Sequence, residues 1–357
     1  MSSLPLLDQH QPPSSLVGIA RLAAEGESIS DGHDVEFFTL ASRSLLNRCT
    51  APRMPFTWTI NPYRGCEFAC KYCYARYTHE FMEMRDGVDF ERKIYVKQRA
   101  AELLRRDLRK VKPGEEIAIG TATDPYQPAE RRYGATRAIL EVFAEQSGFD
   151  IGMVTKSDLV LRDVELLREV ARQNKLFVNV TITTLNSDLA RILEPRAPRP
   201  DLRMKAVQQL NQSGVPAGVI CAPVIPGITD SAPDLDALVK ATRDAGGRYI
   251  FANPLFLKPC SAAIFLPWLE KEFPHLVQTY RERYGERAYL GPAYRKRISQ
   301  LMARLRQKHG IGTQRDRDQL EREAAAGEQC AAPRAKPVRY VEGPAEEPLF
   351  EEQMRLF

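Results

Sequence analysis

Six apolar runs rich in β-branched and aromatic residues recur along the chain, and amphipathic stretches with a helical period separate most of them. The runs cover residues 56–63, 115–121, 149–155, 176–183, 215–224 and 248–255. The helical stretches cover residues 131–146, 159–173, 201–212 and 232–246. Strands that alternate with helices form parallel sheets with right-handed crossovers. The pattern therefore predicts an α/β fold in which parallel strands curl into a partial (β/α)6 TIM-type barrel.

The same pattern divides the chain into four parts. Residues 1–35 are rich in proline, serine and glycine with little periodicity, which indicates a flexible N-terminal arm. We expect the barrel core over residues 36–265 and a helical C-terminal extension over residues 266–312. Residues 313–357 are polar, with prolines and acidic patches, as is typical of a disordered tail.

The composition is that of an ordinary globular protein, with 43% hydrophobic and 27% charged residues. No apolar run approaches the roughly 20 residues of a membrane-spanning helix, and the start of the chain lacks the features of a secretory signal. Seven cysteines, three of them clustered, argue against a disulfide framework and for a reducing compartment. We therefore expect a cytoplasmic protein without a membrane partner.

The formal net charge of +5 is uneven along the chain. Basic residues gather between residues 99 and 112 and again between residues 281 and 308. Such clusters are typical either of solvated helix faces or of a nucleic-acid contact. Charge alone does not decide between these two interpretations.

Three cysteines within eight residues are the most informative chemical feature of the sequence. Cys66, Cys70 and Cys73 follow the first predicted strand, at the end of a barrel where active sites lie. A structural zinc site normally takes four protein ligands, and a cubane iron–sulfur cluster normally takes four thiolates. Three close thiols therefore favour a cluster with one iron left open for chemistry. A zinc site and inert buried thiols remain the alternatives.

The C-x3-C-x2-C spacing, with Tyr72 before the third cysteine, resembles the motif of radical S-adenosylmethionine (radical SAM) enzymes. The longer string INPYRGCEFACKYCYARYTHEF at residues 60–81 resembles the branch that includes spore photoproduct lyase and DNA repair photolyase-like proteins. The resemblance implies a [4Fe-4S] cluster on Cys66, Cys70 and Cys73, with S-adenosylmethionine on the open iron. It also implies a flavodoxin- or ferredoxin-like electron donor and a 5′-deoxyadenosyl radical that abstracts hydrogen from a substrate.

The resemblance also assigns roles to polar residues at the ends of the predicted strands. Thr121, Thr123 and Asp124 match positions that hold the methionine amino group, although an Asp-Pro turn explains this stretch equally well. Lys156 matches a lysine that reaches the S-adenosylmethionine carboxylate, and it would be a natural charge partner. A lysine that is merely exposed is the alternative.

Further candidates lie on the fourth and fifth predicted strands and beside the cysteines. Thr181 and Thr183 share one strand face by period two and are expected to point into the barrel, where their hydroxyls would contact a ribose or a carboxylate. Buried threonines that bond to the backbone are the alternative. Pro226 and Gly227 match the turn that cradles adenine in radical SAM proteins. Tyr72 and Tyr74 match the tyrosines that relay the radical in the photoproduct lyase branch.

One departure from that branch affects the expected reaction. Spore photoproduct lyase returns a hydrogen atom from a cysteine placed just after the second strand, whereas residues 120–124 contain no cysteine here. Thr121 stands nearest to that place, and its O–H bond is too strong to replace a thiol. The substrate therefore stays open between nucleic acid and protein. A non-enzymatic metal-binding or redox-sensing nucleic-acid adaptor is the alternative function, but it would not need polar residues around the barrel mouth.

The last residues of the chain form a separate motif. Gln353, Met354, Leu356 and Phe357 resemble the short peptide with which bacterial proteins bind the DNA sliding clamp. Two apolar anchors on a polar tail suit a groove on a partner. A chance apolar ending that folds back on the domain is the alternative, because short motifs often match by accident.

Overall fold

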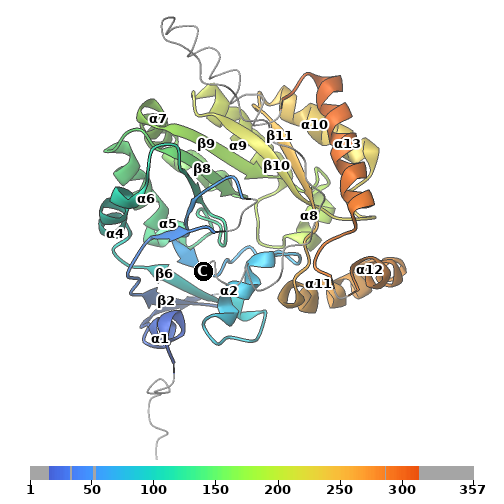
Figure 1. Cartoon of the computed structure of the whole chain (residues 1–357). Coiled ribbons are helices and arrows are strands. Elements are labelled where there is room, and N and C mark those ends of the chain that lie inside the picture. The colour runs from blue at the N-terminus through green and yellow to red at the C-terminus, as the bar shows by residue number, and fades with distance from the viewer. Residues whose placement is uncertain (1–15, 33, 51–53, 286, 313–357) are drawn as a thin grey trace, which may run out of the picture.

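The computed structural model describes residues 16–32, 34–50, 54–285 and 287–312, and its centre is a curved β-sheet (Figure 1). The strands of this sheet are β3 (Leu46–Arg48), β4 (Trp58–Ile60), β7 (Glu116–Ile119), β8 (Asp150–Thr155), β9 (Lys175–Thr181), β10 (Ala217–Val224) and β11 (Ile250–Pro254). Their order is β11-β10-β9-β8-β7-β4-β3. Neighbours are parallel from β4 to β11, and β3 is antiparallel to β4. The expected partial barrel of parallel strands is confirmed.

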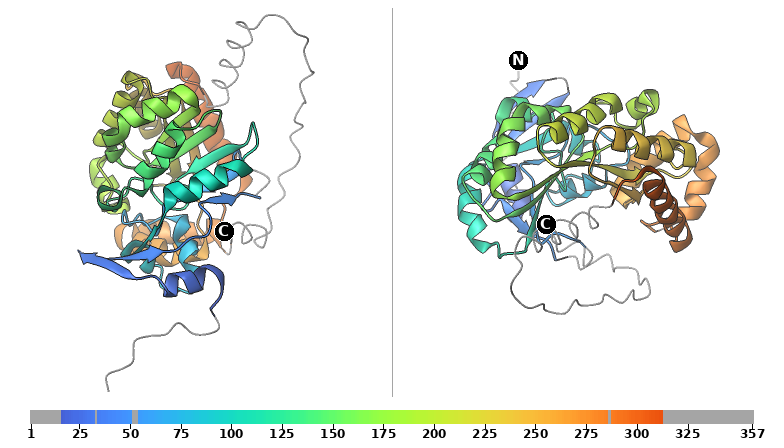
Figure 2. Two further views of the ribbon diagram at one scale, coloured as in Figure 1. Left: turned by 90° about the vertical axis from the view of Figure 1, so that its left-hand side faces the viewer. Right: turned by 90° about the horizontal axis from the view of Figure 1, so that it is seen from above.

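Most of the helical elements that connect the parallel strands lie on the outer face of the sheet (Figure 2). They are α4 (Ala100–Asp107), η2 (Leu108–Lys110), α6 (Ala135–Ala144), η3 (Asp158–Asp163), α7 (Val164–Gln173), α9 (Pro200–Gln212) and α10 (Ala232–Asp244). Two others, α5 (Glu130–Tyr133) and α8 (Ser187–Leu193), lie at the mouth of the barrel instead. Their apolar stripes explain this placement, since α7 buries Leu167 and Val170 while its charged residues stay at the surface.

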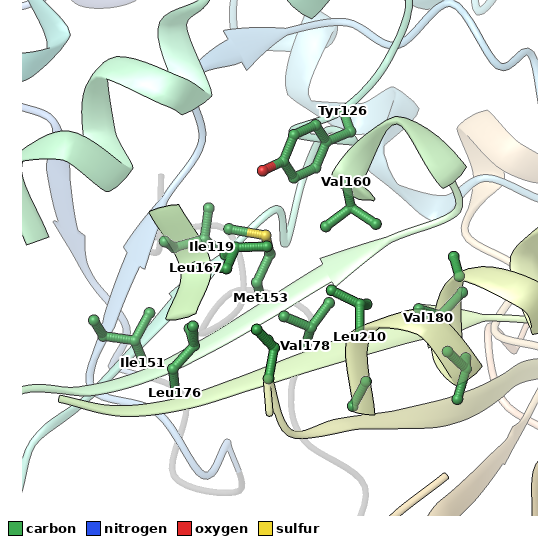
Figure 3. Close-up of a cluster of buried hydrophobic side chains, with 14 of the residues drawn as sticks. Ile119, Tyr126, Ile151, Met153, Val160, Leu167, Leu176, Val178, Val180 and Leu210 are labelled. Carbon is green, nitrogen blue, oxygen red and sulfur yellow. The ribbon is translucent and has the colours of Figure 1, made fainter. Parts of the chain in front are cut away.

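The main core lies between the sheet and these helices (Figure 3). Strand β9 shows how its two faces differ, because Val178 and Val180 are fully buried in this core. Side chains alternate along a strand, so Asn179 and Thr181 belong to the opposite face, inside the barrel. This agrees with the expected inward direction of Thr181. The inner face of β9 is therefore polar toward its C-terminal end, and its outer face is apolar.

A second sheet lies beside the barrel and was not predicted from the sequence. It contains β1 (Ser28–Gly32), β2 (Val35–Leu40), β5 (Tyr63–Arg64) and β6 (Lys93–Lys97), in the order β1-β2-β6-β5. Three short helical elements adjoin it: η1 (Tyr74–Arg76), α2 (Tyr77–Glu80) and α3 (Asp89–Arg92). Strand β5 immediately precedes the cysteines, so this sheet supports their loop.

The expectation of a flexible arm over residues 1–35 is wrong for its second half. Residues 18–24 form α1 (Gly18–Ala24), and β1 pairs with β2 in an antiparallel hairpin. Ala23 of α1 packs in an apolar cluster with Leu40 and Tyr95, which accounts for the order of this segment. Residues 1–15 lie outside the described residues.

Four helical elements follow the last strand of the barrel. They are α11 (Pro259–Glu272), η4 (Pro274–Leu276), α12 (Val277–Tyr284) and α13 (Pro292–His309). Helix α13 packs against α10 and β11, and α11 packs beside the cysteine loop. Helix α11 begins before residue 266, so it crosses the predicted border between core and extension. The predicted tail at residues 313–357 lies outside the described residues.

Among the residues that the structure describes, every helix is too short or too polar to cross a bilayer.

Candidate metal and cofactor site

The three cysteines of the motif lie in one loop at the mouth of the barrel, directly after β4 and β5. Cys66 and Cys70 are buried, Cys73 is half-buried, and all three thiols are free. The loop consists of turns rather than a helix. The three thiols thus come from a single short loop and not from facing elements.

Gly65 determines how the chain enters this loop. Its φ of +82° lies in the region that favours glycine. A Cβ atom there would lie 2.8 Å from the backbone oxygens of Phe90 and Lys93. A side chain at this position would therefore displace the start of the cysteine loop.

Neighbouring elements hold the backbone of the loop on several sides. Four hydrogen bonds do so: Cys66 N to Phe90 O at 2.9 Å, Lys71 N to Leu193 O at 2.9 Å, Arg76 Nη2 to Cys70 O at 3.0 Å, and Ser261 Oγ to Cys73 O at 3.0 Å. These partners come from α3, α8, η1 and α11. The loop is therefore fixed in place before any ligand binds.

The segment after β7 also supports the loop. The Thr123 hydroxyl donates to the carbonyl of Gly65 at 2.6 Å, and the Gln127 amide donates to the same carbonyl at 3.1 Å. Gln127 also accepts a hydrogen bond from the Glu67 backbone at 3.0 Å. Thr123 is thus engaged with the loop itself. Its predicted contact with the methionine amino group stays a prediction.

Burial controls the ionisation of the thiols. It raises the pKa of Cys66 well above the ordinary value and raises the pKa of Cys70 to about 12, although the charge of Lys156 lowers the latter in part. Without a metal both thiols are therefore protonated at neutral pH. Metal ligation requires thiolates, so binding must displace these protons.

The donor set suits a cluster better than a single ion. In the described part of the chain, no three side chains of histidine, cysteine, aspartate or glutamate are arranged around one metal position. A zinc ion would hold its thiolates about 2.3 Å from one point, whereas a cubane cluster gives each thiolate its own iron. Three free thiols spread along one fixed loop fit the second case.

A buried charged network lies beside the cysteines. Arg203 Nη2 and Glu194 Oε2 form an ion pair at 2.5 Å, and both side chains are 1% exposed. Glu194 also accepts hydrogen bonds from the Thr183 hydroxyl at 2.7 Å and from the Tyr72 hydroxyl. The network therefore fixes the ring of Tyr72, which lies between the second and third cysteines in sequence.

Lys156 completes this network at the mouth of the barrel. Its Nζ atom lies 5.7 Å from the centre of the Tyr72 ring. Burial opposes its charge, but the neighbouring acidic groups outweigh burial and raise the pKa of the ammonium group, and Glu194 is the one that is ionised at neutral pH. Lys156 therefore stays protonated next to the cysteine loop, and it is not the merely exposed lysine of the alternative interpretation.

Asp124 holds the backbone of Lys156 in place. Its carboxylate accepts hydrogen bonds from the Thr155 hydroxyl at 2.7 Å, from the Lys156 backbone at 2.7 Å and from the Tyr126 backbone at 2.9 Å. Burial raises the pKa of this carboxyl, and the hydrogen bonds offset part of the rise. The structure gives Asp124 internal partners, and its predicted contact with the methionine amino group stays a prediction.

The remaining predicted residues are more scattered. Tyr74 is 42% exposed, and its hydroxyl donates to the backbone carbonyl of Thr121. Thr181 is buried two residues from Thr183, and its carbonyl accepts from Arg203 at 3.2 Å. Thus Tyr72, Lys156, Thr183 and the cysteines gather in one place.

Pro226 and Gly227 lie in the turn after β10. The carbonyl of Pro226 accepts a hydrogen bond from Tyr280 at 2.8 Å, and Gly227 has a φ of +74°. The turn therefore packs against α12 and η4 of the C-terminal helices. A role in holding adenine stays a prediction.

Sequence reasoning missed Glu194 and Arg203. A signal for Arg203 does exist, because it falls in the apolar stripe of α9 with Ala206, Val207 and Leu210. An arginine within such a stripe must be buried, and a buried arginine requires an acidic partner. Glu194, at the end of α8, is that partner.

The family model described as the radical SAM superfamily matches residues 60–239, just over half of the chain. An uncharacterised protein of Mycobacterium tuberculosis is 34% identical over 313 residues, which cover 87% of this chain and 91% of that protein. An uncharacterised protein of Methanocaldococcus jannaschii is 25% identical over 256 residues, covering 72% of this chain and 91% of that protein. These relatives carry no assigned activity in their names.

Solved structures of spore photoproduct lyase have a similar fold. One, complexed with dinucleoside spore photoproduct, superposes with a TM-score of 0.58 over 84% of this chain and 85% of that chain. Its sequence identity of 14% is low, so the likeness concerns the fold.

Proposed function

The chain belongs to the radical SAM superfamily, and we propose that it cleaves S-adenosylmethionine reductively with a [4Fe-4S] cluster held by Cys66, Cys70 and Cys73. Bound there, the cluster would supply the electron that splits a carbon–sulfur bond and yields a 5′-deoxyadenosyl radical for hydrogen abstraction. The observation that carries this proposal is the fixed loop at the barrel mouth with its three free thiols, of which Cys66 and Cys70 are buried and Cys73 is half-buried. Membership of an enzyme superfamily leaves the non-enzymatic adaptor without support.

The chain's own residues have defined tasks in this proposal. Lys156 holds a positive charge beside the loop and would bind the carboxylate of S-adenosylmethionine. Glu194 and Thr183 hold Tyr72 in one orientation next to it. The half-exposed Tyr74 would face the substrate side of the site. The walls of the cofactor site would be completed by Thr121, Thr123, Asp124, Thr181, Pro226 and Gly227.

We propose a nucleic acid as the substrate and a flavodoxin- or ferredoxin-like protein as the electron donor. The fold shared with a lyase that binds a dinucleoside supports the first assignment. The free cysteines support a reducing, cytoplasmic location. The clamp motif at Gln353, Met354, Leu356 and Phe357 lies outside the described residues, and we propose it as a link to DNA.

The cofactor itself provides the first test. Protein purified without oxygen is expected to be brown, to contain iron and sulfide, and to absorb near 400 nm, a value on the order of what thiolate-bound iron gives. Metal analysis and an absorption spectrum measure both properties. A colourless preparation that retains one zinc ion per chain after iron and sulfide reconstitution would contradict the proposal.

Replacing Lys156 by alanine tests the carboxylate contact. The loss of a charge-assisted hydrogen bond is expected to weaken S-adenosylmethionine binding by about 1.5–3 kcal/mol. Calorimetric titration of the reconstituted protein measures this, with iron content checking that the cluster remains. Lys205→Ala, on α9, is a control with the same change of charge. Equal affinity in wild type and Lys156→Ala would show that Lys156 has no part in binding.

A further inference from the structure

A cationic hollow lies next to the cysteine loop, between the edge of the barrel and the second sheet. Arg64 of β5 and Lys97 of β6 line it together with the side chains of Asn47, Asn61 and Thr78. The hollow has room for about one water molecule. Neither the mechanism above nor the predicted cofactor contacts use this place.

Its two cations have no counter-charge in the described part of the chain. Lys97 is 5% exposed, and no described residue forms an ion pair or a side-chain hydrogen bond with it. The buried Nε atom of Arg64 also lacks a hydrogen-bond partner. Burial and the nearby Arg64 lower the pKa of Lys97 to about 7. Burial and Arg64 thus disfavour the charged form of Lys97, and an anion that joins the two basic groups would restore it.

The hollow is close to the proposed chemistry. Ala122 lines it and also packs in one apolar cluster with Cys66, Cys70 and Tyr72. The amide of Asn61 connects the two places, because it accepts from Ala122 N at 2.8 Å and donates to the Thr121 hydroxyl at 3.3 Å. An anion in the hollow would therefore lie beside the cofactor site.

Thr121 also connects to a group of exposed aromatic rings through Tyr74. Tyr74, which bonds to the Thr121 carbonyl, has its ring 6.3 Å from that of Phe256, and Phe256 stacks on Tyr289 at 4.4 Å. Tyr74 and Tyr289 are 42% and 37% exposed. We call Tyr74, Phe256 and Tyr289 the aromatic shelf. Flat, exposed rings of this kind bind nucleobases by stacking.

We propose that the hollow receives one oxygen of a phosphate group of a single-stranded nucleic acid, while an adjoining base stacks on the aromatic shelf. This inference rests on the proposed function and names the substrate class of the same site. Arginine and lysine are suited to a phosphate oxygen. The shelf favours a nucleic acid over an acidic peptide, because a carboxylate side chain would leave the rings uncovered.

A binding experiment tests the proposed phosphate and base contacts. A short fluorescein-labelled single-stranded DNA is titrated with the cluster-loaded protein, and fluorescence anisotropy measures the affinity at several salt concentrations. Lys97→Met is expected to weaken binding about 10–100-fold. It should also lower the slope of log affinity against log salt by about 0.7, the value for one phosphate contact on a single strand. Phe256→Leu should weaken binding without changing the slope, because stacking involves no counterion.

Lys240→Met is the matched control, since it removes the same charge from an exposed lysine that pairs with Asp244. Its affinity and salt slope should equal those of the wild type. Methionine has nearly the shape of lysine and removes an unpaired buried charge, so Lys97→Met should melt no lower than the wild type.

Two results would overturn the proposal. One is a Lys97→Met protein with the affinity and salt slope of the wild type, which would mean that the hollow holds only water. The other is equal competition by polyglutamate, which would mean that any anionic chain is accepted. S-adenosylmethionine cleavage by the wild type is measured separately, so a failure of the proposed chemistry is distinguishable from a failure of the phosphate site.

Discussion

Replacing Arg203 by methionine is expected to destabilise the protein by about 3–5 kcal/mol, because it leaves the buried carboxylate of Glu194 without its partner. Burial opposes the ionisation of Glu194, but Arg203 and Lys156 outweigh it and hold the pKa of its carboxyl below the ordinary value. The free energy of unfolding, obtained from urea denaturation, measures the effect.

Two further variants separate the ion pair from other causes. Arg199→Met breaks an exposed pair with Asp201 and should cost no more than about 1 kcal/mol. The double variant Glu194→Gln, Arg203→Met removes both charges and should recover much of the stability lost in Arg203→Met. A loss below about 1 kcal/mol in Arg203→Met would show that the pair does not hold this part of the barrel together.

The second large effect is expected from Cys70→Ala, which should abolish cluster assembly. A cluster held by three thiolates is left with two, and the loop contains no further cysteine to replace the lost one. The loss is measured as the iron and sulfide content per chain. The absorbance near 400 nm, on the order of what thiolate-bound iron gives, is a second measure.

Cys221→Ala is the control for that variant. Cys221 is also buried and free, but it lies in β10, where its thiol faces the carbonyl of Thr183 at 3.9 Å. This variant should load iron as the wild type does. A full iron content in Cys70→Ala, or its loss in both variants, would contradict the assignment of the three ligands.

The barrel was predictable because its strands are long apolar runs. Buried parallel strands such as 150–155 and 217–224 need apolar residues on nearly every position, which makes them visible in the sequence. The second sheet was missed because β1 is short and polar and β5 has only two residues. Order in that sheet arises from pairing with distant strands, which local composition does not reveal.

The candidate site was predictable only where spacing carries the chemistry. Cys66, Cys70 and Cys73 are recognisable because three ligands lie close together in one loop. Glu194 and Arg203 come from different helices and meet only in the folded chain. The sequence gives no sign that Lys97 is buried, because its burial depends on packing beside Arg64 in a sheet that was not predicted.

Two of the residues predicted to bind the cofactor at the strand ends also have internal partners, and their contact with the cofactor stays a prediction. Thr123 and Asp124 have the polar groups expected of ligands, but the structure joins them to Gly65 and to the backbone of Lys156. Sequence indicates which polar groups reach the barrel mouth. It does not indicate which of them the fold itself requires.

The central claim is most directly tested by product analysis. Reconstituted protein, reduced without oxygen in the presence of S-adenosylmethionine, is expected to release 5′-deoxyadenosine and methionine in equal amounts. Cys70→Ala, treated identically, should release neither. Formation of 5′-deoxyadenosine by Cys70→Ala at the wild-type rate, or its absence from iron-loaded wild-type protein, would contradict the account.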